Sequence, residues 1–214
     1  MKKRIIAVAL VVVLVLSFAM LSGCSKGSKQ NLVGIFLPTK EQPIWPAFGE
    51  SLEKGFKDAG FEVITEFAED VVERQISQIE NAITKGAKYI IVSGVDSYAL
   101  SDVCKKAKEA GATVIACDRL IMNSKDVDYY VTFDMIRLGE IQGESIVEAL
   151  DLKSGKGPFN LEIFSGSPDD NNCVPFYTGL MNVIKPYIDN GQLVVKSGQV
   201  DLSVTATLKW DSAL

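Results

Sequence analysis

Residues whose side chains can bind a hydroxyl-rich ligand follow several apolar segments of this 214-residue chain. They are Lys40, Trp45, Asp118, Arg119, Asp134, Asp170 and Asn172. Aspartate accepts hydrogen bonds, arginine and lysine donate them, asparagine does both, and an indole covers an apolar C–H face. A missing hydroxyl would leave one of these partners unpaired, which is how such a site distinguishes similar sugars. The set therefore predicts a monosaccharide-binding site.

Helix capping is an alternative interpretation for three of these residues. Asp170 and Asn172 precede a predicted helix, and both are preferred capping types. Asp134 precedes the helix predicted over 136–150, and helix capping explains an aspartate at this position about as well as ligand contact does. Both interpretations stay open for these residues at the level of sequence.

The other candidates have alternatives too. Trp45 could be a hydrophobic staple at a helix start. Asp118 and Arg119 could be solvated charges, although a charged pair directly after a buried strand is unusual on a surface. Lys40 alone means little, because exposed lysines are common.

Composition excludes several kinds of chemistry. The chain contains no histidine, which excludes a Ser/His or Cys/His pair and a His-ligated metal site, and we expect no cofactor and no metal. The formal net charge is −5, and it becomes −8 without Lys2, Lys3 and Arg4. This acidic balance argues against nucleic acid as a partner. A carboxylate glycosidase is disfavoured, because adjacent acids such as Asp169 and Asp170 cannot flank a glycosidic bond from opposite sides.

Apolar periodicity predicts alternating strands and helices. Strands are expected at 32–37, 63–64, 89–92, 113–116, 129–133, 160–164 and 193–195, and helices after Pro46 and over 72–83, 100–110, 136–150 and 176–187. Gly60, Gly86 and Gly111 end three strand–helix units at spacings of 26 and 25 residues. This pattern predicts an α/β fold with parallel sheets flanked by helices, whose ligands bind beyond the carboxyl ends of the strands.

The N-terminal segment indicates export. A basic start precedes the apolar run 5–21, which is shorter than the about 20 residues of a membrane-spanning helix. Residues 21–24 resemble a lipobox, so we expect a signal peptide over 1–23, lipidation of Cys24 and a polar tether over 24–31. The alternative is an uncleaved anchor. Either arrangement exposes the remaining chain on the extracytoplasmic face. The three further cysteines lack a CxxC spacing, so no disulfide framework is inferred, and Cys104 is expected to be a small buried side chain.

Several segments together resemble the type I periplasmic-binding-protein-like sugar receptors of ABC importers, in particular their xylose-binding and multiple sugar-binding members. The segments are 38–40 with Trp45, 75–81, 118–121, 132–134, 166–172 and 185–189. The resemblance implies two βα lobes, 32–132 and 133–214, that close on a sugar about a hinge near 131–134. It also implies a hydroxyl-binding role for Asp118 and Arg119 in the first lobe and for Asp170 and Asn172 in the second.

The same resemblance places Lys40 and Trp45 at the edge of the cleft, with Trp45 stacking on the sugar. It leaves ligand contact by Asp134 in question, because Met135 stands where the family usually has asparagine. The segment 75–81 lies on a predicted amphipathic helix and is interpreted as packing.

The function implied by the resemblance is capture of a monosaccharide of the xylose, glucose, galactose or arabinose type by a monomeric receptor that delivers it to an ABC permease. A sensor accessory that presents the sugar to a membrane kinase is the alternative. A sugar-responsive repressor shares the lobes but needs an N-terminal helix-turn-helix, which residues 1–31 lack. Family members continue beyond the position of residue 214, so we expect a fragment with an incomplete second lobe.

Overall fold

The computed structural model of the protein describes residues 31–211. The expected signal peptide and Cys24 lie outside the described residues. We call the part up to Val131 the first lobe and the part from Met135 onward the second lobe. Within these two lobes, no helix has the length and apolar character needed to cross a bilayer.

The first lobe contains a five-stranded sheet in which every neighbouring pair is parallel. Its strands are β1 (Leu32–Leu37), β2 (Glu62–Phe67), β3 (Tyr89–Val92), β4 (Thr113–Cys117) and β5 (Tyr129–Val131), in the order β2-β1-β3-β4-β5. Every residue of β1 is buried, which explains why its sequence is a continuous apolar run. The predicted parallel α/β arrangement is confirmed.

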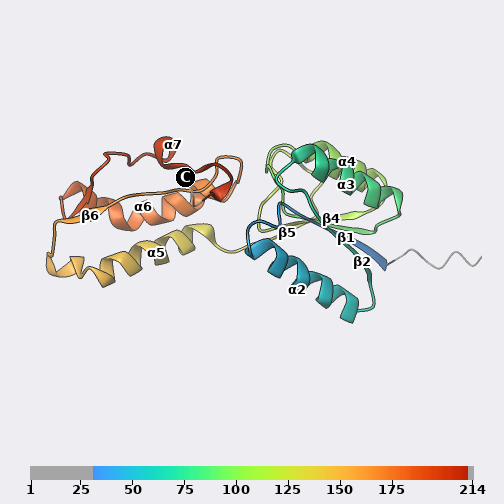
Figure 1. Ribbon diagram of the computed structural model, residues 1–214, viewed down its shortest axis with the longest axis horizontal. Coiled ribbons are helices and arrows are strands. Elements are labelled where there is room, and N and C mark those ends of the chain that lie inside the picture. Colours follow the sequence, from blue (N-terminus) through green and yellow to red (C-terminus); the bar gives the residue numbers. More distant parts are fainter. Residues whose placement is uncertain (1–30, 212–214) are drawn as a thin grey trace, which may run out of the picture. The chain divides into compact units, whose positions relative to one another are not determined.

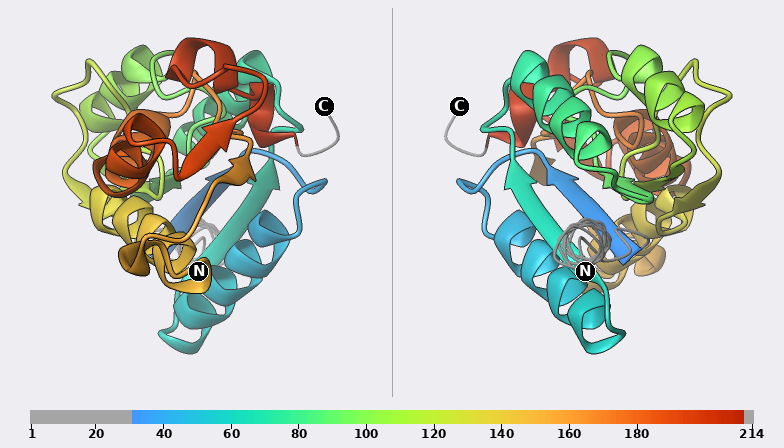
Figure 2. Two further views of the ribbon diagram at one scale, coloured as in Figure 1. Left: turned by 90° about the vertical axis from the view of Figure 1, so that its left-hand side faces the viewer. Right: turned by 90° about the vertical axis from the view of Figure 1, so that its right-hand side faces the viewer.

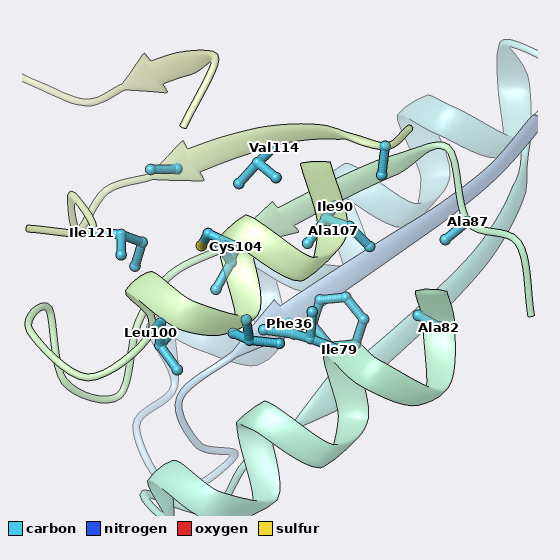
Figure 3. Close-up of a cluster of buried hydrophobic side chains, with 14 of the residues drawn as sticks. Phe36, Ile79, Ala82, Ala87, Ile90, Leu100, Cys104, Ala107, Val114 and Ile121 are labelled. Carbon is cyan, nitrogen blue, oxygen red and sulfur yellow. The ribbon is translucent and has the colours of Figure 1, made fainter. Parts of the chain in front are cut away.

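Helices cover both faces of this sheet (Figure 1). The helix α2 (Ile44–Asp58) lies on one face, and α3 (Val72–Thr84) and α4 (Ser101–Glu109) lie on the other. Figure 3 shows the core beneath α3 and α4, where Phe36 and Ile90 of the sheet pack against helical residues such as Ile79. Two hydrophobic layers therefore hold the sheet and fix its carboxyl edge.

The second lobe pairs two long helices with a small parallel sheet. It contains α5 (Met135–Ala149), β6 (Phe159–Leu161), α6 (Cys173–Asp189) and β7 (Leu193–Val195), together with the short helices η2 (Leu152–Ser154), α7 (Leu202–Thr205) and η3 (Leu208–Trp210). Helices α5 and α6 pack side by side, as the left view of Figure 2 shows. A Cβ atom added to Gly139 or Gly179 would overlap with backbone atoms of the opposite helix, so glycine permits this close packing.

Two predicted strands are shorter in the structure than the apolar runs suggested. Strand β5 ends at Val131 rather than at residue 133, because its partner β4 ends at Cys117. Strand β6 likewise ends at Leu161, where its pairing with β7 stops. Gly60, Gly86 and Gly111 have φ angles of +86°, +84° and +79°, the left-handed conformation that often ends a helix, so the three predicted helix ends are confirmed.

Candidate functional site

The carboxyl ends of β1 and β4 meet residues of the second lobe around a cavity of about 320 Å³. Its lining consists of Gln42, Ile44, Trp45, Asp118, Arg119, Met135, Asp170, Asn172, Phe176 and Trp210. The structure therefore brings together five residues of the predicted set, namely Trp45, Asp118, Arg119, Asp170 and Asn172.

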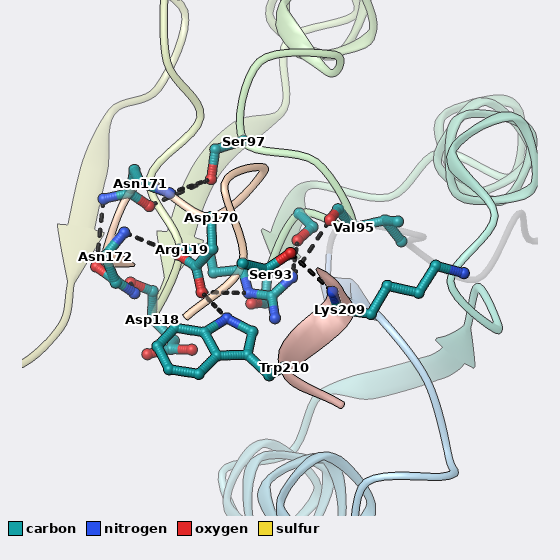
Figure 4. A network of polar contacts seen from close by, with 12 residues as sticks. Ser93, Val95, Ser97, Asp118, Arg119, Asp170, Asn171, Asn172, Lys209 and Trp210 are labelled. Carbon is teal, nitrogen blue, oxygen red and sulfur yellow. Dashed lines mark hydrogen bonds and ion pairs between the residues drawn. The ribbon is translucent and has the colours of Figure 1, made fainter. Parts of the chain in front are cut away.

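A buried ion pair forms the centre of this cavity wall (Figure 4). Arg119 Nε of the first lobe lies 3.0 Å from Asp170 Oδ2 of the second lobe. Arg119 is 5% exposed and Asp170 is 4% exposed, so the solvated-charge alternative is wrong for Arg119. Taking two charges out of water is costly unless they are paired and hydrogen-bonded, and both conditions hold here.

Further hydrogen bonds fix the positions of both charged groups. Arg119 Nη1 donates to the carbonyl oxygens of Gly94 and Val95, at 3.1 and 3.3 Å. Asp170 Oδ1 accepts from the backbone N–H of Asn172 at 2.8 Å, and Asp170 Oδ2 accepts from Trp210 Nε1 at 2.9 Å. The ion pair is thus held in one geometry from both sides.

The buried residue Gln75 supports the loop that Arg119 contacts. Gln75 Nε2 donates to the carbonyl of Ser93 at 2.8 Å, and Gln75 Oε1 accepts from the backbone N–H of Val95 at 2.8 Å. Gln75 lies on α3 and does not line the cavity. The segment 75–81 therefore contributes packing and loop support, in line with its interpretation from sequence.

Asp118 combines an unusual backbone with a partly buried carboxylate. Its φ angle is +61°, a left-handed conformation that is uncommon outside glycine and often occurs at functional sites. Its carbonyl oxygen accepts from Tyr130 Oη, Thr132 Oγ1 and Asn172 Nδ2 at 2.9, 3.0 and 2.9 Å. Burial and the charge of Asp170 raise the pKa of the Asp118 carboxyl, and Arg119 opposes that shift.

Trp45 belongs to the first turn of α2 and forms an aromatic wall. It is 4% exposed, and its Nε1 donates to Gln42 Oε1 at 3.1 Å. The guanidinium carbon of Arg119 lies 5.3 Å from the centre of the indole ring, which is a favourable cation–π distance. The staple interpretation is wrong, because α2 begins at Ile44 and Trp45 is already inside the helix.

The capping interpretation is also wrong for Asn172. Asn172 directly precedes α6, but its side chain makes no capping hydrogen bond. Its Nδ2 donates instead to the carbonyl of Asp118, and its Oδ1 accepts from Tyr130 Oη at 3.3 Å. Asn172 therefore connects the second lobe to the first.

Lys40 and Asp134 lie outside the cavity. Lys40 Nζ is 5.1 Å from the centre of the Phe67 ring and lines a separate groove of about 500 Å³ with residues of α2, including Glu50 and Glu53. Asp134 Oδ1 accepts from the backbone N–H of Arg137 at 3.0 Å, so Asp134 caps α5 as its alternative interpretation held. Ligand contact by these two residues stays a prediction that their positions do not favour.

Five lining residues were not among the candidates from sequence: Gln42, Ile44, Met135, Phe176 and Trp210. Phe176 lies one helical turn after Asn172, so the spacing of four residues could have indicated a shared face. Gln42 and Ile44 adjoin Trp45 in sequence. Trp210 carries no local signal, because η3 reaches the cavity only through the folding of the second lobe.

The cysteines and acidic side chains of residues 31–211 are the other groups that could bind a metal or react. No group of three or more metal-binding side chains forms among these residues. Cys104, Cys117 and Cys173 are free and buried. Burial raises the pKa of Cys104 to about 12, and Cys104 is the small buried side chain expected from the sequence.

Comparison with known proteins identifies relatives of matching fold. A periplasmic binding protein domain matches residues 33–214. The multiple sugar-binding periplasmic receptor ChvE of Rhizobium radiobacter is 50% identical over 184 residues, which are 86% of this chain and 52% of the receptor. The D-xylose-binding periplasmic protein of Escherichia coli K12 is 32% identical over 180 residues, which are 84% of this chain and 52% of that protein.

A solved structure gives the same result. The solute-binding protein of an ABC transporter from Clostridium phytofermentans, with bound β-D-glucose, superposes with a TM-score of 0.80 at 50% identity, covering 83% of this chain and 55% of that one. This chain thus spans about half the length of the curated relatives it matches. The match implies an extracytoplasmic location. Because the domain match covers most of its length, the chain belongs to the periplasmic binding protein family, whose members bind substrates and are not enzymes.

Proposed function

We propose that the cavity binds a monosaccharide and that the whole protein delivers this sugar to an ABC permease. The observation that carries the proposal is that Asp118, Arg119 and Asp170 line one cavity together with two indoles, those of Trp45 and Trp210. Hydrogen bonds between hydroxyls and charged groups contribute about 1.5 to 3 kcal/mol each, so a few are sufficient for a neutral polyol. The indoles cover its C–H faces.

The acceptor groups leave room for sugar hydroxyls. The Asp118 carboxylate receives no hydrogen bond from any described residue, so both of its oxygens can accept from a ligand. A carboxylate offers about four acceptor positions in total, of which protein hydrogen bonds take two at Asp170. Asp118 is therefore the principal acceptor, and the Asp170 carboxylate offers fewer free positions.

The names of the relatives support a simple aldose as ligand. They mention multiple sugars, D-xylose and β-D-glucose, and the same residue types suit galactose and arabinose. Delivery to a permease is favoured over presentation to a sensor kinase, because the structural neighbour is the solute-binding protein of an ABC transporter.

Calorimetry with D-xylose, D-glucose, D-galactose and L-arabinose tests the proposal. We would compare the 214-residue chain with a chimera that adds the part of the R. radiobacter receptor that this chain does not match, and with that receptor itself. We expect the chimera to bind and the 214-residue chain to bind weakly or not at all, because relatives supply more chain. A folded chimera that binds no sugar while the receptor does would refute the function, and equal affinities of both lengths would refute the need for more chain.

We further propose that Cys24 is lipidated after removal of residues 1–23. The support is the basic and apolar N-terminal segment that ends in Leu21-Ser22-Gly23-Cys24. Tethering would raise the effective concentration of the receptor at its permease. Replacing Cys24 by serine should release the protein from the membrane fraction without changing its sugar affinity. Retention of the variant in washed membranes would contradict the proposal.

A further inference from the structure

Asn171 lies between two cavity residues but does not line the cavity itself. Asp170 and Asn172 reach the cavity wall, whereas the Asn171 side chain lies next to Ser97 of the first lobe (Figure 4). The Asn171 side chain therefore contacts other protein groups and does not reach the site of the proposed ligand.

The Asn171 amide uses its full hydrogen-bonding capacity. Oδ1 accepts from the backbone N–H of Leu120 at 2.8 Å and from Ser97 Oγ at 3.2 Å. Nδ2 donates to Tyr130 Oη at 3.4 Å and to Asn172 Oδ1 at 3.2 Å. Because Leu120 offers a backbone donor, the orientation of the amide is determined without ambiguity.

Three of these partners belong to different parts of the first lobe. Ser97 follows β3, Leu120 follows β4, and Tyr130 is within β5. Ser97 adds two backbone contacts across the lobes, since its Oγ accepts from Asn171 N at 3.1 Å and its N–H donates to the carbonyl of Asp169 at 2.9 Å. We call this set of hydrogen bonds around Asn171 the polar clasp.

We propose that Asn171 is a positioning residue whose polar clasp holds the two lobes closed over the cavity. Ser97 is 0% exposed, so water does not compete for its hydrogen bonds while the lobes are in contact. In a hinged receptor, affinity is the product of ligand binding to the open form and the closure equilibrium. The clasp acts on the second factor alone. Its consequence for sugar affinity rests on the function proposed above, but its effect on closure does not.

The Asn171→Ala variant tests this role in two independent ways. Small-angle scattering of the sugar-free chain should show a larger radius of gyration, because the lobes separate more often. Stopped-flow indole fluorescence of the sugar-binding form should show dissociation faster by about tenfold at an unchanged association rate, as expected from losing a few net hydrogen bonds that form after the encounter. A residue that only supported the fold would not separate these two rates.

Asn190→Ala is the matched control. Asn190 also makes two side-chain hydrogen bonds, but both go to Gln192 within the second lobe. It should leave the radius of gyration and both rates unchanged. Ser97→Ala removes the clasp hydrogen bonds from the side of the first lobe. It should also enlarge the radius of gyration and speed dissociation, and it can replace Asn171→Ala if that variant fails to fold. The effects of the two substitutions should be less than additive in the double variant. Asn172 is unsuitable, because it both lines the cavity and crosses the lobes.

Two results would overturn the proposal: a radius of gyration equal to that of the wild type in both clasp variants, or an unchanged dissociation rate in both. If even the chimera bound no sugar, the proposed function would fail, and the scattering comparison would still decide whether the clasp holds the lobes.

Discussion

Asp170→Asn exchanges one carboxylate oxygen of the buried ion pair for an amide nitrogen. The N–H groups of Asn172 and Trp210 donate hydrogen bonds to the Asp170 carboxylate, and the Arg119 guanidinium lies beside it as its counter-charge. An asparagine has a single acceptor oxygen. One orientation of its amide turns the NH₂ group toward Arg119 and Trp210, and the other turns it toward Asn172. Either way, at least one donor faces another donor and Arg119 loses its counter-charge.

The magnitude follows from the burial of both partners. Removing one partner of a buried ion pair costs about 3 to 5 kcal/mol. Arg119 keeps two carbonyl partners, Gly94 and Val95, so we take the lower end, about 3 kcal/mol. The two charges lie in different lobes, and Arg119 regains water when the lobes separate. The cost therefore falls on the closed form, and it corresponds to a loss of sugar affinity of about 100-fold.

Isothermal titration calorimetry and urea unfolding, followed by circular dichroism, measure the two effects separately. We expect the affinity of the sugar-binding form to fall as stated and its free energy of unfolding to change by less than about 1 kcal/mol. Asp189→Asn is the matched control, because Asp189 pairs with Lys185 at 2.7 Å on an exposed surface. Such exposed pairs contribute about 0 to 1 kcal/mol.

Two outcomes would refute this reasoning. An Asp170→Asn variant with nearly wild-type affinity would show that the pair is not needed in the closed form. An unfolding free energy lowered by about 3 kcal/mol with unchanged affinity would show that the pair stabilises the fold and not closure.

Three further predictions concern other parts of the chain. Gly179→Ala should lower the unfolding free energy by about 2 kcal/mol or more, because the new Cβ would overlap the carbonyl of Ile136. Gly55→Ala, at a position of α2 with open space around it, should raise the unfolding free energy by about 0.5 to 1 kcal/mol. Urea unfolding of both variants measures these changes. The pKa of Asp118 is raised in the folded protein, so the folded form keeps its proton at pH values above the usual pKa of 3.8. The unfolding free energy of the wild type relative to that of Asp118→Asn should therefore fall as the pH rises above 3.8, and a difference that stays constant between pH 4 and 7 would contradict this prediction. Native Cys104 should resist a thiol reagent at pH 8 and react after denaturation, as mass spectrometry would show.

The fold of the first lobe was predictable because its strands are buried on both faces and its helices each present one apolar stripe. The runs at 32–37 and 89–92 therefore stand out, and a parallel sheet places the residues that follow its strands at one edge. Asp118 and Asp134 both follow a strand, yet only Asp118 reaches the cavity. Strand β5 is an edge strand that leads directly into α5, so the Asp134 carboxylate caps that helix.

The remaining features depend on contacts between distant segments. Trp210 donates to Asp170 across 40 positions of sequence, and no local pattern contains that information. Asp170, Asn171 and Asn172 are consecutive polar residues of similar type. Only the path of the loop before α6 determines that Asn171 faces the first lobe while its neighbours line the cavity.

The contacts between the lobes use many backbone atoms. The carbonyls of Asp118 and Asp169 accept across the lobes, and the N–H groups of Ser97 and Leu120 donate across them. Side-chain substitutions leave such groups in place provided that the chain keeps its path. Substitution of the Asp118 side chain, which lines the cavity, can therefore alter ligand preference while the lobes continue to meet through the same backbone groups, so recognition of new sugars can evolve without a change in these contacts.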